Sequence, residues 1–194
     1  MSKDKIIVGI SGATGIQYGV KALELLKAQN IETHLIISKS AELVRTLETD
    51  YSREYILGLA DHTYAVQDIG ATVSSGSFKT KGMLIAPCSV KTMSEIATGV
   101  TSSLLSRAAD VILKEKRKLV LMFRETPLHL GHIQTMEKVT QMGAIVMPPV
   151  PAFYAKPQTI DEMVTFSVAR ALDLFDIEIK IKRWTKEYIE EMKH

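Results

Sequence analysis

The chain has 194 residues, of which 46% are hydrophobic and 24% charged, a composition that is typical of a globular domain and excludes intrinsic disorder. Its 24 Lys and Arg residues against 22 Asp and Glu give a net charge of +2, too balanced to indicate nucleic-acid binding, and a single Cys excludes an internal disulfide and a four-Cys zinc site. No apolar run approaches the ~20 residues that span a bilayer, and the first is too short for a secretion signal, so we expect a cytoplasmic protein without membrane contact.

Short β-branched runs alternate with longer helical stretches along the chain. In chain order, the sequence predicts a strand over 5–10, a helix over 15–29, a strand over 33–37, a helix over 39–47, a strand over 82–86, helices over 90–97 and 102–116, a strand over 118–122, a helix over 128–142, a strand over 144–147 and a helix over 160–175. The strands lack polar alternation, so both faces of their sheet should be covered. We therefore expect an α/β three-layer sandwich with a mainly parallel, Rossmann-like (flavodoxin-like) sheet.

The whole chain, residues 1–194, is expected to form one domain with a C-terminal helical tail from about residue 176. Residues 51–72 carry little signal. Ligands of parallel sheets bind outside the carboxyl ends of the strands. The candidate functional residues are therefore those that directly follow each strand.

The turn after the first strand, Gly9-Ile-Ser-Gly-Ala-Thr-Gly15, consists of small residues that let a ligand approach the backbone, ahead of a helix whose free N–H groups attract an anion. Its spacing is G-x-x-G-x-x-G, not the G-x-G-x-x-G of dinucleotide sites. The second strand ends in Ser38-Lys39-Ser40, where a NAD site would place an acidic residue for the ribose. These residues favour a mononucleotide such as FMN; the alternative is a tight turn without a ligand.

The segment after the strand at 82–86 is Ala86-Pro-Cys-Ser-Val-Lys-Thr92, in which Ser89 and Thr92 can cap a helix or bind an anion. We interpret Cys88 as a small buried hydrophobic residue rather than a nucleophile. The loop Ser74-Ser-Gly-Ser-Phe78 is either a plain linker or a source of hydroxyls for a ligand.

Arg124 and Glu125 follow the strand at 118–122, directly before a turn with Pro127. Arg can grip a phosphate with two donors and Glu can carry a proton; the alternative is a surface ion pair or a helix cap. After the last strand, a stiff Pro-rich loop ends in Tyr154, which can donate a hydrogen bond or simply pack.

Two features that could indicate other ligands are set aside. His129 and His132 lie three apart on one predicted helix, but no Asp, Glu or Cys stands at a typical ligand spacing, so we assign them to solvent or an interface. The basic run 114–118 lies at a helix C-terminus, where cations offset the helix dipole. We expect neither a metal nor a nucleic acid to bind.

Taken together, these segments resemble the UbiX/Pad1 family of flavin prenyltransferases, whose members are also called the small subunit of hydroxyaromatic acid decarboxylases. The matching stretches, from Ile6 to about Trp184, are GISGATGIQYG, LIISKSAELVRTLET, SSGSF, APCSVKTMSEIATG, LLSRAADVILKEKRKLVLMFRETPLH, MGAIVMPPVPAFYAKPQT and VARALD. The family often has Ser where this chain has Thr14, and both carry a hydroxyl.

The resemblance implies transfer of a dimethylallyl group from dimethylallyl monophosphate to reduced FMN. The product, prenylated FMN, would serve a UbiD-type decarboxylase partner. The resemblance also implies a homo-oligomer, a dodecamer. The chain has no D-D-x-x-D motif for Mg²⁺, so protein cations should stabilise the leaving phosphate without a metal. By motif position, the implied FMN site comprises Gly12, Ala13, Thr14, Ser38, Ser89, Val90, Lys91, Thr92 and Arg124. The implied dimethylallyl phosphate site comprises Lys114, Arg124, Tyr154 and Arg170, with Ser75, Glu125 and Lys114 as catalytic residues and Glu48, Arg107 and Trp184 as further pocket positions.

Two other functions compete with this interpretation. An FMN-dependent cysteine decarboxylase shares the fold, but it needs a His beside the first helix and an Asn after the strand at 82–86, and this chain has neither. A non-catalytic FMN-binding subunit of a decarboxylase complex would need no second phosphate site. The cationic residues implied for that second site argue against it.

Overall fold

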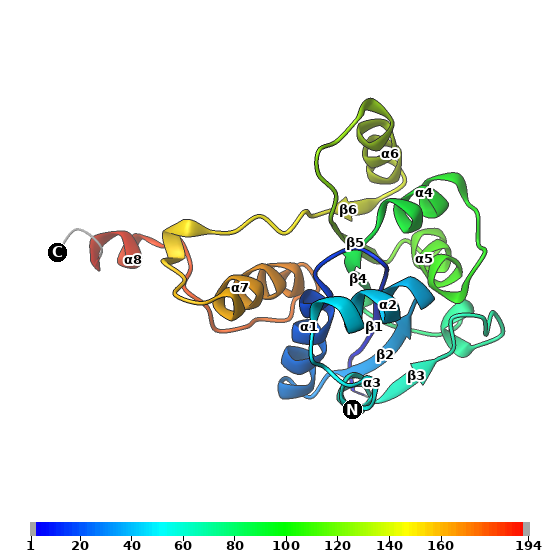
Figure 1. The fold of residues 1–194 in the computed structure, drawn as a ribbon, viewed down its shortest axis with the longest axis horizontal. Coiled ribbons are helices and arrows are strands. Elements are labelled where there is room, and N and C mark those ends of the chain that lie inside the picture. The colour runs from blue at the N-terminus through cyan, green and yellow to red at the C-terminus, as the bar shows by residue number, and fades with distance from the viewer. Residues whose placement is uncertain (1–2, 192–194) are drawn as a thin grey trace.

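The computed structural model describes residues 3–191, in which six parallel strands form one sheet between two layers of helices (Figure 1). In the spatial order β3-β2-β1-β4-β5-β6, the strands are β3 (His62–Tyr64), β2 (Glu32–Ile37), β1 (Lys5–Ile10), β4 (Gly82–Cys88), β5 (Lys118–Phe123) and β6 (Ala144–Val146). This order reverses between β1 and β4, and such a switch point leaves a crevice at the carboxyl ends of the two strands.

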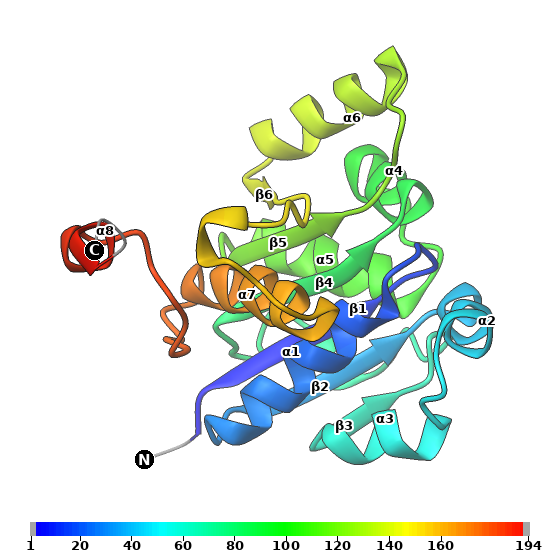
Figure 2. The same cartoon turned by 60° about the vertical axis from the view of Figure 1, so that its left-hand side comes forward.

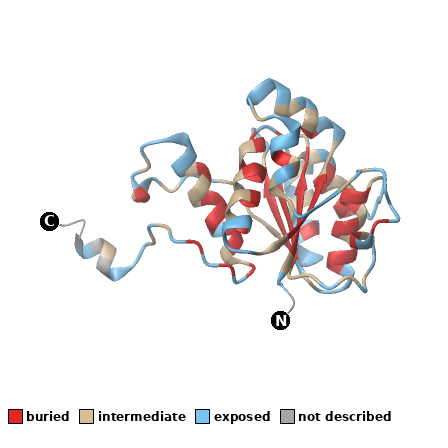
Figure 3. Ribbon diagram, turned by 90° about the horizontal axis from the view of Figure 1, so that it is seen from below, coloured by how far each residue is buried: buried red, intermediate tan, exposed pale blue. Residues whose placement is uncertain are grey.

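Helices cover both faces of the sheet (Figure 2). The helical elements are α1 (Ile16–Ala28), α2 (Lys39–Glu48), α3 (Arg53–Leu59), η1 (Thr72–Ser74), α4 (Val90–Thr98), α5 (Leu104–Lys114), α6 (Leu130–Gln141), η2 (Phe153–Ala155), α7 (Ile160–Asp173) and α8 (Lys186–Glu191). One apolar cluster joins α1 and α7 to one face of the sheet, and a second joins α4 and α5 to the other. Figure 3 shows these buried residues concentrated in the strands and on the helix sides that face them.

The predicted strands and helices are confirmed, with ends that differ by a few residues. β1, β2, β4 and β5 are buried almost throughout, and in β4 every residue is buried. Fully covered strands need no polar alternation, which is why their apolar runs were informative. Among residues 3–191, no helix combines the length and the apolar character needed to cross a bilayer.

The structure adds two elements in residues 51–72, where the sequence carries little signal. Helix α3 has only seven residues and buries only Ile56, and β3 has three residues at the edge of the sheet. Neither is long enough to show a hydrophobic period.

The C-terminal tail differs from the predicted helix. Residues 177–185 contain no helix, and α8 begins only at Lys186. Ile177 and Ile179 are buried while Glu178 and Lys180, the residue after each, are exposed, so the segment alternates with a period of two. That alternation indicates an extended chain that buries one side, here against the cluster formed by α1 and α7.

Candidate functional site

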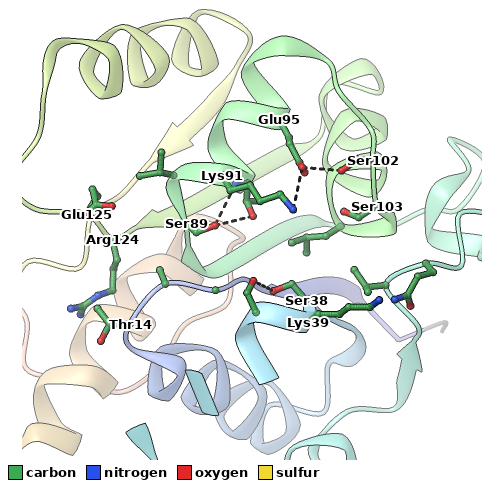
Figure 4. Close-up of a pocket in the computed structure, with 18 residues that line it drawn as sticks. Thr14, Ser38, Lys39, Ser89, Lys91, Glu95, Ser102, Ser103, Arg124 and Glu125 are labelled. Carbon is green, nitrogen blue, oxygen red and sulfur yellow. Dashed lines mark hydrogen bonds and ion pairs between the residues drawn. The ribbon is translucent and has the colours of Figure 1, made fainter. Parts of the chain in front are cut away.

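A cleft of about 810 Å³ opens at the carboxyl ends of β1, β2, β4 and β5, across the switch point (Figure 4). This size is typical of small-molecule sites. Its lining includes all nine residues expected to contact a mononucleotide, together with Glu125. The other lining residues are Lys39, Ser40, Val66, Gln67, Glu95, Ser102, Ser103 and Leu105.

The turn after β1 is held against its neighbours by backbone contacts that only glycine allows. A Cβ at Gly12 would collide with the Ser40 side chain, and Gly15 has a φ of 95°, in the left-handed region. Ser11 ties this turn to the one after β4, because its Oγ donates to Pro87 O at 2.9 Å and accepts from Ser89 N at 2.7 Å. The two turns therefore form one preformed wall of the cleft.

Several helices direct their N-termini at the cleft. Ser38 caps α2 by accepting from Ala41 N at 3.1 Å, Ser89 caps α4 by accepting from Thr92 N, and Ser103 caps α5. Each N-terminus carries partial positive charge and unpaired N–H groups. Their convergence makes the cleft suited to a phosphorylated ligand.

Arg124 enters the cleft at the end of β5. Its guanidinium lies 5.4 Å from the centroid of the Tyr18 ring, and its backbone N donates to Cys88 O at 3.0 Å. Among the described residues, its buried Nε has no hydrogen-bond partner. A buried donor left without a partner indicates a position where a ligand acceptor belongs.

Two carboxylates accept hydrogen bonds from the backbone in this part of the molecule. Glu125, next to Arg124, is exposed at the cleft, and its Oε1 accepts from Thr126 N at 2.9 Å. Glu48 does not line the cleft; its Oε2 accepts a hydrogen bond from Gly15 N, the residue before α1, at 2.7 Å. A carboxylate exposed at the edge of a cleft can carry a proton to or from a bound ligand.

Apart from Arg124, the residues expected to bind the second substrate are not among those that line this cleft in the same chain. Lys114 ends α5, and because a helix rises 1.5 Å per residue, it lies roughly 16 Å from the Ser103 cap at the cleft. Ser75 lies in the loop against that far end, where Arg117 holds Gly76 O and Phe78 O. Arg107 lies between, paired with Asp110 at 2.8 Å. Within one chain, the Ser75 loop therefore lies away from the cleft and supplies no hydroxyl to it.

Tyr154, Trp184 and Arg170 form a separate group on the side of α7. The Tyr154 ring packs edge-on against Trp184 and Phe166, with centroids 5.1 and 5.7 Å away, and Arg170 follows Phe166 by one helical turn. Arg170 pairs with Asp173, which Arg183 also grips with two bonds of 2.7 and 2.8 Å. The Arg183 guanidinium holds the pKa of Asp173 below its usual range. Aromatic and cationic groups thus meet here, away from the cleft.

Sequence reasoning missed the cleft residues that do not directly follow a predicted strand. Val66 and Gln67 follow β3, which was not predicted, and Ser102 and Ser103 precede α5. The Thr-Ser-Ser run at 101–103 was a usable signal, since such residues favour helix starts. Glu95 reaches the cleft one turn into α4, where it accepts from Ser102 Oγ at 2.8 Å.

Cys88 is confirmed as a buried residue, and burial raises the pKa of its thiol, which leaves no nucleophilic thiolate. His129 and His132 stack on each other at the start of α6, with ring centroids 3.6 Å apart. Neither histidine lines the cleft as described over residues 3–191.

Comparison with known proteins gives consistent results. The family described as Flavoprotein matches residues 1–172. The flavin prenyltransferase UbiX of Neisseria meningitidis serogroup B is 58% identical over 90% of this chain and 92% of its own. A crystal structure of AnUbiX (PadA1) in complex with FMN and dimethylallyl pyrophosphate has a TM-score of 0.90 at 45% identity, covering 95% of this chain and all (100%) of that one. A dodecameric FMN-dependent UbiX-like decarboxylase from Escherichia coli O157:H7 has a TM-score of 0.91 at 48% identity, covering 93% and 99%.

Proposed function

This chain belongs to the Flavoprotein family, among the UbiX-type flavin prenyltransferases, and we propose that it transfers a dimethylallyl group from dimethylallyl monophosphate to reduced FMN. In this reaction the carbon–oxygen bond to phosphate breaks, phosphate leaves with the electron pair, and the alkyl carbon bonds to the flavin ring as a ring proton is lost. The observation that supports this most is the convergence of capped helix N-termini and Arg124 on one cleft.

The residues of the cleft fit FMN. The N-termini of α2 and α4 and the orphaned Nε of Arg124 offer donors to a phosphate, and Gly12 lets a ring system approach the backbone. We assign FMN binding to Gly12, Ala13, Thr14, Ser38, Ser89, Val90, Lys91, Thr92 and Arg124. Reduced FMN would supply the nucleophilic ring to be alkylated, and the chain's residues would orient it and exclude water.

The second phosphate requires residues that one chain does not bring to its own cleft. We propose that Lys114, Arg170 and Tyr154, with Trp184, reach the cleft of a neighbouring copy, so that the complete site forms between subunits. The remote position of these groups and the dodecameric state of a similar protein support this. Their charges would stabilise the phosphate as it leaves. The product would serve a UbiD-type decarboxylase.

A mixing experiment tests the shared site. Lys114→Ala and Glu125→Gln chains, each nearly inactive alone, are expected to regain activity when co-assembled, since some sites then combine both native residues. If both residues served one chain's site, every site would keep one defect and activity would stay low. Each variant reassembled with itself is the control.

FMN should bind tightly and NAD negligibly. The end of β2 presents Ser38, Lys39 and Ser40, without the carboxylate that would bind the ribose of NAD. Fluorescence titration of the purified protein with both nucleotides measures this. Comparable affinity for NAD would show that the ligand class has been misassigned.

Prenyl transfer should proceed at an unchanged rate in excess EDTA. The sequence has no paired-aspartate motif for Mg²⁺, and the leaving group can be stabilised by Arg and Lys instead. The rate is measured with reduced FMN and dimethylallyl phosphate under anaerobic conditions. A strict Mg²⁺ requirement would refute the claim that protein cations replace the metal.

The reaction itself is tested by the mass and absorption spectrum of the flavin formed in that assay. An FMN adduct that carries one dimethylallyl unit is expected. Recovery of unmodified FMN from a saturated, correctly assembled protein would favour the non-catalytic FMN-binding subunit.

A further inference from the structure

Three potential metal ligands meet at the amino end of β2, at the edge of the sheet opposite the cleft. His34 of β2 and His62 of β3 are paired in register, so their side chains emerge on the same face of the sheet. Glu32 precedes His34 by two residues, and a strand returns to the same face every second residue. The backbone alone therefore places one carboxylate and two imidazoles together.

Their separations match those around a small divalent ion. Glu32 Oε1 lies 3.1 Å from His34 Nε2 and 3.4 Å from His62 Nε2, and ligand atoms of all three residues lie within 4.8 Å of one another. Ligands that sit 2.0–2.2 Å from a tetrahedral zinc are separated from one another by about 3.3–3.6 Å. The 3.4 Å spacing from Glu32 to His62 falls in that range, and the 3.1 Å spacing from Glu32 to His34 is slightly shorter.

A second layer of contacts orients the buried histidine. His34 is 3% exposed, and its Nδ1 lies 2.9 Å from the Tyr64 hydroxyl, which in turn lies 3.2 Å from Thr72 Oγ1. With Nδ1 donating its proton to Tyr64, the lone pair of Nε2 is left for an ion, the arrangement that usually surrounds a ligating histidine.

His62 supplies the adjustable ligand. Its side chain is 52% exposed, and its ring stacks on His34 with centroids 4.6 Å apart. Stacked rings do not point both lone pairs at one ion, so the His62 ring must turn, and its exposure leaves it free to do so. The same opening provides a path for the ion.

Lys5 would compete with a metal ion for the Glu32 carboxylate. Its Nζ lies 3.2 Å from Glu32 Oε1 and 5.4 Å from the centroid of the Phe78 ring. It therefore neutralises Glu32 when no metal is bound. An ion that binds Glu32 must displace this ammonium toward solvent, which lowers the affinity of the site for metal.

We propose that Glu32, His34 and His62 bind a divalent transition-metal ion of the Zn²⁺ type, with solvent completing its coordination. Two imidazoles and a carboxylate suit zinc better than the all-oxygen ions Mg²⁺ and Ca²⁺. The ion would link β2 to the three-residue edge strand β3, which otherwise pairs only along His62–Tyr64. The site lies at the opposite ends of the strands from the flavin cleft, so its role is structural.

The test uses untagged, EDTA-treated protein titrated with Co²⁺, followed by its visible absorption, and with Zn²⁺, followed by calorimetry. We expect one ion per chain, with tetrahedral Co²⁺ absorption and a higher unfolding temperature with Zn²⁺. His62→Gln, at a position where the side chain is 52% exposed, should weaken binding by at least ~10²-fold, because even second-layer partners are worth 10–100-fold. Lys5→Gln should strengthen binding, because it removes the competitor.

A control distinguishes this cluster from the other histidine pair. The His129→Ala/His132→Ala double variant removes the stacked pair of α6 and should bind Co²⁺ like the wild type. Unchanged binding in His62→Gln, or binding lost only in the double control, would overturn the proposal. So would weaker binding in Lys5→Gln, or the absence of saturable binding in the wild-type protein.

Discussion

Glu125→Gln is expected to slow prenyl transfer by ~10²–10⁴-fold, the usual effect of losing an acid–base group. The affinity for FMN should stay within a few-fold, because Gln keeps the size of the side chain and the cleft's cationic donors come from Arg124 and the helix N-termini. Glu125 stands directly after Arg124 at the end of β5, exposed at the cleft, where a carboxylate can exchange protons with both ligand and solvent.

The measurement combines single-turnover kinetics with an FMN titration of the same preparation. Glu137→Gln is the matched control, since it neutralises an exposed carboxylate of α6, hydrogen-bonded to Gln141 and outside the cleft lining. Wild-type turnover in Glu125→Gln would remove this carboxylate from the mechanism. A large loss of FMN affinity would reassign it to binding.

Arg170→Ala is expected to raise the concentration of dimethylallyl phosphate required for half-maximal rate by about 10- to 150-fold. That range corresponds to ~1.5–3 kcal/mol for a lost hydrogen bond to a charged group, at 1.4 kcal/mol per decade. FMN binding should be intact, because Arg170 lies away from the flavin cleft of its own chain. The fold should also persist, because Asp173 keeps its two-bond contact with Arg183.

Steady-state kinetics with each substrate varied in turn checks this result. Tyr154→Phe should have a smaller effect, since a neutral hydroxyl contributes about 0.5–1.5 kcal/mol. An Arg170→Ala protein that loses FMN, or that keeps the wild-type dependence on dimethylallyl phosphate, would place the second phosphate elsewhere.

The parallel core of the sheet was predictable because each of its strands is a short apolar run that can be recognised without knowing what the strand pairs with. Runs such as Lys5-Ile-Ile-Val-Gly-Ile10 are buried on both faces, and the residues directly after them reach the cleft whatever the details of the connecting loops. Three of the candidate FMN-binding residues, Gly12, Ser38 and Ser89, follow strands in this way.

The remaining features depend on contacts between distant segments. Strand β3 gains its structure by pairing with β2, and without it neither Val66 and Gln67 at the cleft nor His62 beside His34 could be placed. The tail was predicted to be helical from about residue 176, but the short run of alternating Ile and charged residues after α7 forms an extended segment that buries one side. The separation of Lys114 from the cleft follows from the length of α5, and Arg170 lies on α7, outside the cleft lining. The order of motifs along the chain reveals neither.

The Ser11 hydroxyl, which joins the turns after β1 and β4, bears on how the protein recognises its ligand. Because both turns are already tied together, their backbone becomes ordered when the protein folds. Ligand binding therefore loses little further backbone entropy in this wall of the cleft. Because this wall does not rearrange, the association rate constant is not lowered by a conformational change that must accompany binding. Selectivity among flavins would then depend on how long each complex survives rather than on how readily it forms.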